Sequence, residues 1–177
     1  NVTEHERTLA VRLGLPVFGC DPDLYHWGTK SRSRELFREC GLPMPDGFEN
    51  LRNEKGVVNA LFALKQRNPD LRKAVIKMND GFSGEGNAIF YFRDAPSSNL
   101  LQWIGENIET HSKIVAGGMT YRQFMEKFTV MGGIVEAFID GEIKTSPSVQ
   151  CRINPVGAPE VASTHDQMLG GESGQVF

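Results

Sequence analysis

A glycine-rich stretch between two apolar segments constrains this chain more than any other feature. Lys73–Met78 (KAVIKM) and Ala88–Phe92 (AIFYF) are rich in branched and aromatic residues, so both are predicted to be strands. Asn79–Gly86 (NDGFSGEG) joins them. Glycines let backbone N–H groups turn toward an anion with no side chain in the way, and Lys77 adds a positive charge on the incoming strand. The stretch predicts a glycine flap over phosphate groups, between two antiparallel strands.

The spacing of this stretch differs from the common phosphate motifs. A P-loop needs a lysine directly after its glycines, and none follows here. A dinucleotide fingerprint needs G-x-G-x-x-G at the start of a helix, whereas this segment reads G-x-x-G-x-G and a strand follows it. In protein kinases the glycine loop precedes its lysine, and here the lysine comes first. The alternative to a phosphate flap is an exposed hairpin loop that binds no ligand.

A second informative stretch is Gly132–Glu142 (GGIVEAFIDGE). Ile134–Ile139 is predicted to be a strand. Glu136 could accept a hydrogen bond from the exocyclic amine of a purine, and Glu142 could accept from ribose hydroxyls. The alternative is an ordinary β-hairpin that turns at Asp140-Gly141 and carries solvated carboxylates.

The third stretch opens an amphipathic helix predicted over Lys30–Cys40. Thr29 is the expected N-cap, and Leu36, Phe37 and Cys40 are expected to form its buried face. Lys30 would lie at the positive end of the helix, where a cation is tolerable if an anion lies close by; the alternative is a solvated lysine. The basic residues of this helix alternate with glutamates, which predicts a solvated face and not a nucleic-acid patch. These basic residues are Lys30, Arg32, Arg34 and Arg38.

Composition excludes several classes of protein. The chain has 177 residues, of which 40% are hydrophobic and 23% charged, so it is neither a disordered tail nor a fibre. Its net charge of −3 provides no overall basic field for nucleic acid or an anionic membrane. No apolar run approaches the roughly 20 residues that span a bilayer. The three cysteines show no metal-ligand spacing, which favours a reducing, cytoplasmic location.

The remaining pattern predicts an α/β (α+β) chain whose last third is mostly antiparallel β. Glu142–Ile153 is expected to resume the sheet, and Asn154–Gly157 is a turn signal. Ser163–Gln167, together with Gln150 and Arg152, could line a substrate cleft or could be ordinary strand and turn surface. Further helices are expected over 3–13, 54–66, 97–109 and 121–128, and further strands over 15–20 and 160–163.

The order and wording of these stretches resemble the ATP-grasp superfamily. The resemblance is carried by "GTKSRSRELFRECGLPMP", "AVIKMNDGFSGEGNA", "IVEAFIDGE" and "STHDQMLGG". It is closest to the pheganomycin-type peptide ligases and to the ATP-grasp-like segment of IQ-motif-containing protein H. The resemblance implies an ATP-grasp fold of two α+β subdomains that is truncated at the C-terminus. Residues 1–28 would be the end of a preceding Rossmann-like domain, and residues 29–177 an incomplete ATP-grasp nucleotide-binding region.

The resemblance also implies a chemistry. ATP-grasp enzymes phosphorylate a carboxylate to an acyl phosphate, which an amine then attacks, so the implied function is the ATP-binding portion of a carboxylate–amine (peptide-type) ligase. Lys77 would be catalytic. Mg²⁺ would assist, with its ligands expected downstream of Phe177, so the chain alone would be inactive. The implied nucleotide-binding residues are Lys30, Lys77, Gly81, Ser83, Gly84, Gly86, Glu136, Ala137, Phe138 and Glu142.

Two alternatives stay open at this point. One is a catalytically inactive ATP-grasp-like nucleotide-binding or interaction module within a larger protein. The other is a plain α/β interaction domain that binds no nucleotide. A nucleotide reading has a geometric requirement: ATP is about 15 Å long, so Lys77 and Glu136 must lie on one side of the sheet, at opposite ends of one cleft.

Overall fold

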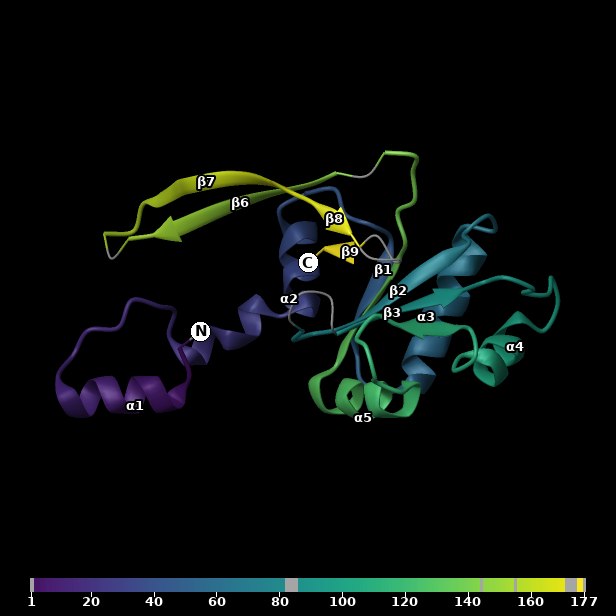
Figure 1. Cartoon of the computed structure of the whole chain (residues 1–177), viewed down its shortest axis with the longest axis horizontal. Helices are drawn as coiled ribbons and strands as arrows, with labels where there is room; N and C mark the ends of the chain where they lie inside the picture. The colour runs from purple at the N-terminus through teal and green to yellow at the C-terminus, as the bar shows by residue number, and fades with distance from the viewer. Residues whose placement is uncertain (1, 82–85, 144, 155, 171–174, 177) are drawn as a thin grey trace.

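The computed structural model describes residues 2–81, 86–143, 145–154, 156–170 and 175–176. A five-stranded antiparallel sheet, in the order β1-β5-β2-β3-β4, forms its centre (Figure 1). The strands of this sheet are β1 (Gly47–Leu51), β2 (Lys73–Met78), β3 (Asn87–Tyr91), β4 (Ser112–Ile114) and β5 (Gly133–Ala137). The helices are α1 (Glu4–Leu13), α2 (Lys30–Glu39), α3 (Glu54–Arg67), α4 (Leu100–Asn107), α5 (Tyr121–Met131) and the 3₁₀ helix η1 (Pro22–Gly28).

A separate two-stranded sheet follows, formed by β6 (Ser146–Ile153) and β7 (Pro159–Gln167). The last strands, β8 (Leu169–Gly170) and β9 (Gln175–Val176), pair with each other. In Figure 1 the β6–β7 hairpin and α1 extend away from helices α3, α4 and α5. The mixed α+β fold and the antiparallel last third are confirmed. None of the described helices is long and apolar enough to cross a membrane.

The hydrophobic core lies between one face of the five-stranded sheet and helices α3, α4 and α5. On β2 the side chains alternate, and Ala74, Ile76 and Met78 face the core. Because the period of a strand is two, Lys77 must emerge on the opposite face, away from α3, α4 and α5. The core therefore fixes the direction in which this lysine points. The helices contribute the fully buried Val57, Leu61, Leu64, Ile104, Phe124 and Phe128.

The register between β2 and β5 places the two predicted site residues on the same face. Lys77 lies opposite Ile134, and Val75 lies opposite Glu136. Directly paired residues of an antiparallel ladder share a face, so Lys77 and Glu136 are diagonal neighbours. This confirms the expectation that both emerge on one side of the sheet.

Two sequence predictions about strands are wrong. Residues 15–20 form no strand, and the chain instead enters η1, where Pro22 occupies the first turn and the Asp21 side chain accepts from the N–H of Asp23. The Asp140-Gly141 hairpin is also absent from the described structure: β6 pairs with β7 and does not resume the sheet. The physical reason is that β1 and β2 already occupy both edges of β5.

Candidate functional site

The candidate site lies where the end of β2, the start of α2 and the middle of β5 meet. Thr29 caps α2 as predicted, accepting a hydrogen bond from the backbone N–H of Arg32. This places Lys30 at the first helical position, beside the base of the flap. Lys77 reaches the same region from β2 and forms an ion pair with Glu136 of β5.

Glu136 is held by two cations at once. Its Oε1 pairs with Lys77, and its Oε2 accepts from Nη1 of Arg34 at 2.9 Å. Only 8% of Glu136 is exposed, so both ion pairs lie largely out of water. The expectation that Lys77 and Glu136 lie at opposite ends of a cleft is therefore wrong. They are direct partners, because diagonal positions on adjacent strands lie within reach of a lysine side chain.

The face of α2 that meets the sheet is polar. Ser31 and Arg34 are its buried residues, whereas Phe37 and Cys40 are exposed. The sequence prediction of an apolar buried face at Leu36, Phe37 and Cys40 is wrong, and so is the assignment of Arg34 to a solvated face. The spacing of three between Ser31 and Arg34 puts both on one side of the helix. Partners distant in the sequence make their burial possible.

Asn79 links the flap to the surrounding elements, a role that the sequence analysis missed. Its Oδ1 accepts from the N–H and the hydroxyl of Ser31, at 3.0 and 2.7 Å. Its Nδ2 donates to the carbonyl of Met131 at 3.1 Å, and its backbone N–H donates to Gly132 O. One amide side chain thus ties α2 to the α5–β5 connection at the flap base.

Lys30 lies close to the flap base and to Lys77. Its Nζ approaches the carbonyl oxygen of Asn79 at 3.4 Å. Burial lowers the pKa of Lys30, and repulsion from Lys77 lowers it further, while Asp80 and Glu136 act in the opposite direction. Two neighbouring cations that repel each other form a site that an anionic ligand would stabilise.

The two ends of the flap come together tightly. The N–H of Met78 donates to Gly86 O at 2.9 Å, and a Cβ on Gly81 would lie 2.9 Å from the Cα of Gly86. Such a contact is too short for a Cβ, so a side chain at position 81 would force this crossing apart. Of the predicted flap residues, Ser83 and Gly84 lie outside the described part of the chain.

Beyond Glu136, the backbone of β5 is already engaged. The N–H of Ala137 donates to Asp46 O at 2.8 Å, and the N–H of Phe138 donates to Lys73 O at 3.2 Å. These two residues therefore have no N–H to offer a purine ring unless the sheet opens, and their carbonyl oxygens are the groups to consider. Glu142 lies in an exposed bend beyond the strand.

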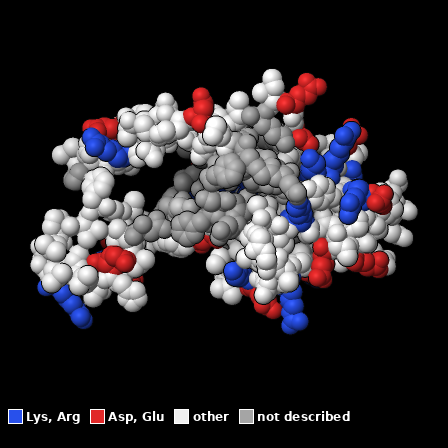
Figure 2. Space-filling model, viewed as in Figure 1, with Lys and Arg blue, Asp and Glu red and all other residues white. Residues whose placement is uncertain are grey.

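Of the remaining polar candidates, Gln150, Arg152 and Ser163 have partners within the β6–β7 hairpin. Ser163 donates to Gln150 at 3.1 Å, and Arg152 pairs with Glu160 at 2.7 Å. His165 and Asp166 are exposed on β7. On the face shown in Figure 2, lysines and arginines are interspersed with aspartates and glutamates.

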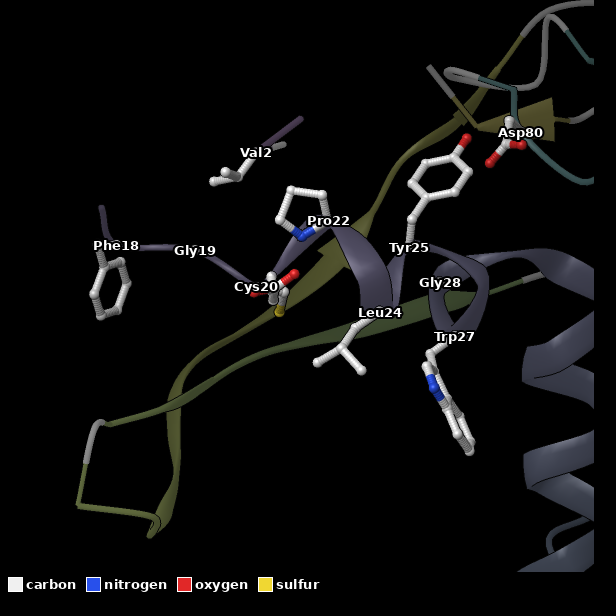
Figure 3. Close-up of a pocket in the computed structure, with 11 residues that line it drawn as sticks. Val2, Phe18, Gly19, Cys20, Pro22, Leu24, Tyr25, Trp27, Gly28 and Asp80 are labelled. Carbon is white, nitrogen blue, oxygen red and sulfur yellow. The ribbon is translucent and has the colours of Figure 1, made fainter. Parts of the chain in front are cut away.

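A cavity of about 830 Å³ lies beside the flap base, lined mainly by η1 and the residues before it. In Figure 3 the ring of Tyr25 points toward Asp80, the residue before Gly81. Its hydrogen bond to Asp80 raises the pKa of the Tyr25 hydroxyl above its usual value, and burial adds to the effect. The contact connects η1 to the flap. Phe18, Leu24 and Trp27 provide much of the apolar lining.

The described residues contain no group of three or more His, Cys, Asp or Glu side chains arranged to hold a metal ion. Glu136 is committed to Lys77 and Arg34, and Asp80 to Tyr25. The part of the chain that the structure describes thus supplies no carboxylate set that fits Mg²⁺.

Comparison with known proteins places this geometry in context. Residues 22–115, slightly more than half of the chain, match the sequence model of a family described as IQCH-like, ATP-grasp. The chain is 29% identical over 148 residues to an L-propargylglycine–L-glutamate ligase of Streptantibioticus cattleyicolor, covering 82% of this chain and 29% of that protein. It is 22% identical over 197 residues to IQ motif-containing protein H of Danio rerio, covering 94% and 19%. The chain spans less than a third of either relative.

Proposed function

Because this chain belongs to the IQCH-like ATP-grasp family, we propose that it binds ATP between its two lysines and supplies the nucleotide-binding part of a carboxylate–amine ligase. One observation carries the proposal: Lys30 and Lys77 converge at the base of a glycine loop, on the sheet face that also presents Glu136. A polyphosphate would relieve the repulsion between the lysines, and a purine amine could reach the carboxylate.

Each residue would then have a defined task. Lys30 would contact the phosphates, and so would Lys77 after its ammonium group has left Glu136. The Gly81–Gly86 loop would cover the phosphates with backbone N–H groups. Glu136 would accept from the adenine amine, and the carbonyl oxygens of Ala137 and Phe138 would face the ring edge. Glu142 would accept from the ribose. Catalysis would consist of positioning and of charge stabilisation at the transferring phosphoryl group, with Lys77 as the catalytic cation.

Magnesium is the usual companion of ATP in this superfamily, where it neutralises phosphate charge. The described residues offer no carboxylate set for it. We therefore assign no Mg²⁺ ligand among the described residues.

The proposed substrates are a carboxylate and an amine, either small molecules or peptides. The relative from Streptantibioticus is named for two amino acids, which offer both functional groups. The proposed reaction transfers the γ-phosphoryl group of ATP to the carboxylate. The amine then attacks the acyl phosphate, forms the amide bond and expels phosphate.

A second candidate function is a nucleotide-binding or interaction module without catalysis. It is supported by the likeness to IQ motif-containing protein H over 94% of the chain, since the name of that relative states no reaction. The two candidates share the ATP site and differ only in turnover.

Calorimetric titration with ATP, followed by a carboxylate- and amine-dependent assay of ADP release by the complete protein, separates these functions. A ligase binds ATP and releases ADP only when both co-substrates are present. A module binds ATP but releases no ADP with any acid–amine pair. Absence of ATP binding would leave the plain interaction domain as the remaining function.

We also infer that residues 1–28 belong to a neighbouring domain that joins the ATP-grasp region through η1, where the family match begins at residue 22. Neither α1 nor η1 contains a buried residue, and large apolar side chains such as Phe18 and Val11 are exposed there. Such a surface is typical of one that packs against another domain. Strong protection of the α1 amides from hydrogen exchange in the isolated chain would count against this boundary.

The lowered pKa of Lys30 predicts a pH dependence of ATP binding. The bound phosphates would raise this pKa, so the protein takes up a proton on binding at pH values between the lowered pKa and that of the complex. Affinity should therefore fall as pH rises through the lowered pKa of Lys30, starting below the reference value of 10.5. Calorimetry in two buffers of different ionisation enthalpy measures the proton uptake. The variant Lys30→Met should lose it; unchanged uptake would show that another group titrates.

A further inference from the structure

We propose that Arg34 is the fixed counter-ion of Glu136, which holds this carboxylate for the adenine amine and frees Lys77 to move to the phosphates. Arg34 is thus a positioning residue for the nucleotide. The inference rests on the proposed ATP site.

The guanidinium of Arg34 is fixed on three sides. Its Nη1 donates to Glu136 at 2.9 Å, its Nη2 donates to the carbonyl of Pro45 at 3.0 Å, and its Nε donates to Glu49 at 3.2 Å. Only 5% of the residue is exposed. Any movement of this guanidinium group would break three hydrogen bonds in a nearly buried place, so Arg34 stays where it is.

Lys77 is the more mobile partner of Glu136. Its side chain is 27% exposed, against 6% for Arg34. Among the described residues, its ammonium group pairs with Glu136. The lysine carries a flexible four-carbon stem on a fixed strand, so its ammonium group can swing while its backbone remains paired in the sheet.

The charges explain why both cations are needed. A nearly buried carboxylate that loses every cation is strongly destabilised. If Arg34 were absent, Glu136 would retain Lys77, and a nucleotide would have to break that pair to engage the lysine. With Arg34 in place, Glu136 keeps one ion pair after Lys77 has left. The same carboxylate also stays aimed at the adenine position.

The polar face of α2 supports this role. A helix that only packs against a sheet would bury apolar side chains, and α2 instead buries Ser31 and Arg34 while Phe37 is exposed. Well-packed apolar side chains often stabilise a fold as much as a buried ion pair does, or more. Arg34 thus connects the helix that carries Lys30 to the carboxylate that would face the adenine ring.

The test compares ATP with ITP, which carries a carbonyl group in place of the adenine amine. Calorimetry should show that the protein prefers ATP. In Arg34→Met, we expect ATP affinity to fall roughly tenfold to a hundredfold, as for loss of a hydrogen bond to a charged group, and the preference over ITP to shrink. In Lys77→Met, affinity for both nucleotides should fall together while the preference remains, because Arg34 still holds Glu136.

Arg38→Met is the matched control. Arg38 lies on the same helix and pairs with Glu49 but not with Glu136. Its variant should bind both nucleotides as the unaltered protein does. If folded Arg34→Met keeps the affinity and the preference of the unaltered protein, the inference is wrong. If the unaltered protein binds no ATP, the proposed function fails, which is a different result.

A double variant covers the case in which Arg34→Met does not fold. An amide at position 136 needs no counter-ion and releases Lys77. Arg34→Met/Glu136→Gln should therefore fold and regain much of the ATP affinity, without the preference over ITP. A merely structural role of Arg34 predicts no such recovery, and a failure to recover overturns the inference.

Discussion

In the complete ligase, replacing Lys77 with methionine should lower ADP-forming turnover by about 10²–10³, the usual cost of removing one positioned charge that stabilises a transition state. Turnover should suffer more than ATP affinity, because charge on the transferring phosphoryl group rearranges only as the reaction proceeds. The fold should survive. Lys77 lies on the sheet face away from the core, and Glu136 keeps Arg34 as a partner.

Steady-state assays of ADP release together with thermal unfolding measure both effects. Lys127→Met is the control, because Lys127 is exposed on α5, on the helical side of the sheet. Lys30→Met should weaken binding more than turnover, since Lys30 lies at a helix start and near the flap base. Normal turnover by folded Lys77→Met would make Lys77 a surface lysine and remove the main support for ligase chemistry.

The sequence predicts the centre of the fold well and its edges poorly. β2 and β3 are apolar and branched, so their assignment needs no tertiary information. β1 (GFENL) is polar, and its pairing with β5 shifts register between Phe48 and Leu51. Asn50 in the shifted segment has a positive φ of 60°. Such a strand exists because β5 offers it an edge, and nothing in its own pattern indicates one.

The candidate site shows the same division. The positions of Lys30 and Lys77 follow from a capped helix start and from a strand that ends at a glycine loop, which are local features. Arg34 and Asn79 act through partners about 50 to 100 positions away, so no local pattern reveals them. A polar pair at helical spacing, Ser31 and Arg34, was the available signal, and it resembles an ordinary solvated face.

Gly133 is where the core and the proposed site meet, and Gly133→Ala should destabilise the protein by about 3 kcal/mol, the upper range for overpacking a core. The residue opens β5 opposite Met78. A Cβ there would lie 2.2 Å from the carbonyl oxygen of Lys77 and 2.3 Å from Cε2 of Phe128. Neither the backbone of β2 nor the buried ring of Phe128 can move without a large loss of packing, so β5 must separate from β2 or from α5.

Urea unfolding should show this as a lower midpoint with an unchanged slope, because the same surface is exposed on unfolding. Gly105→Ala is the matched control: Gly105 lies within α4, an added Cβ meets nothing within 4 Å, and the variant should gain about 0.5–1 kcal/mol from helix propensity. ATP affinity should also fall in Gly133→Ala, since the clash displaces the backbone that carries Lys77. A variant as stable as the unaltered protein would mean that β5 is not held closely against β2, and the Lys77–Glu136 pair would lose its structural basis.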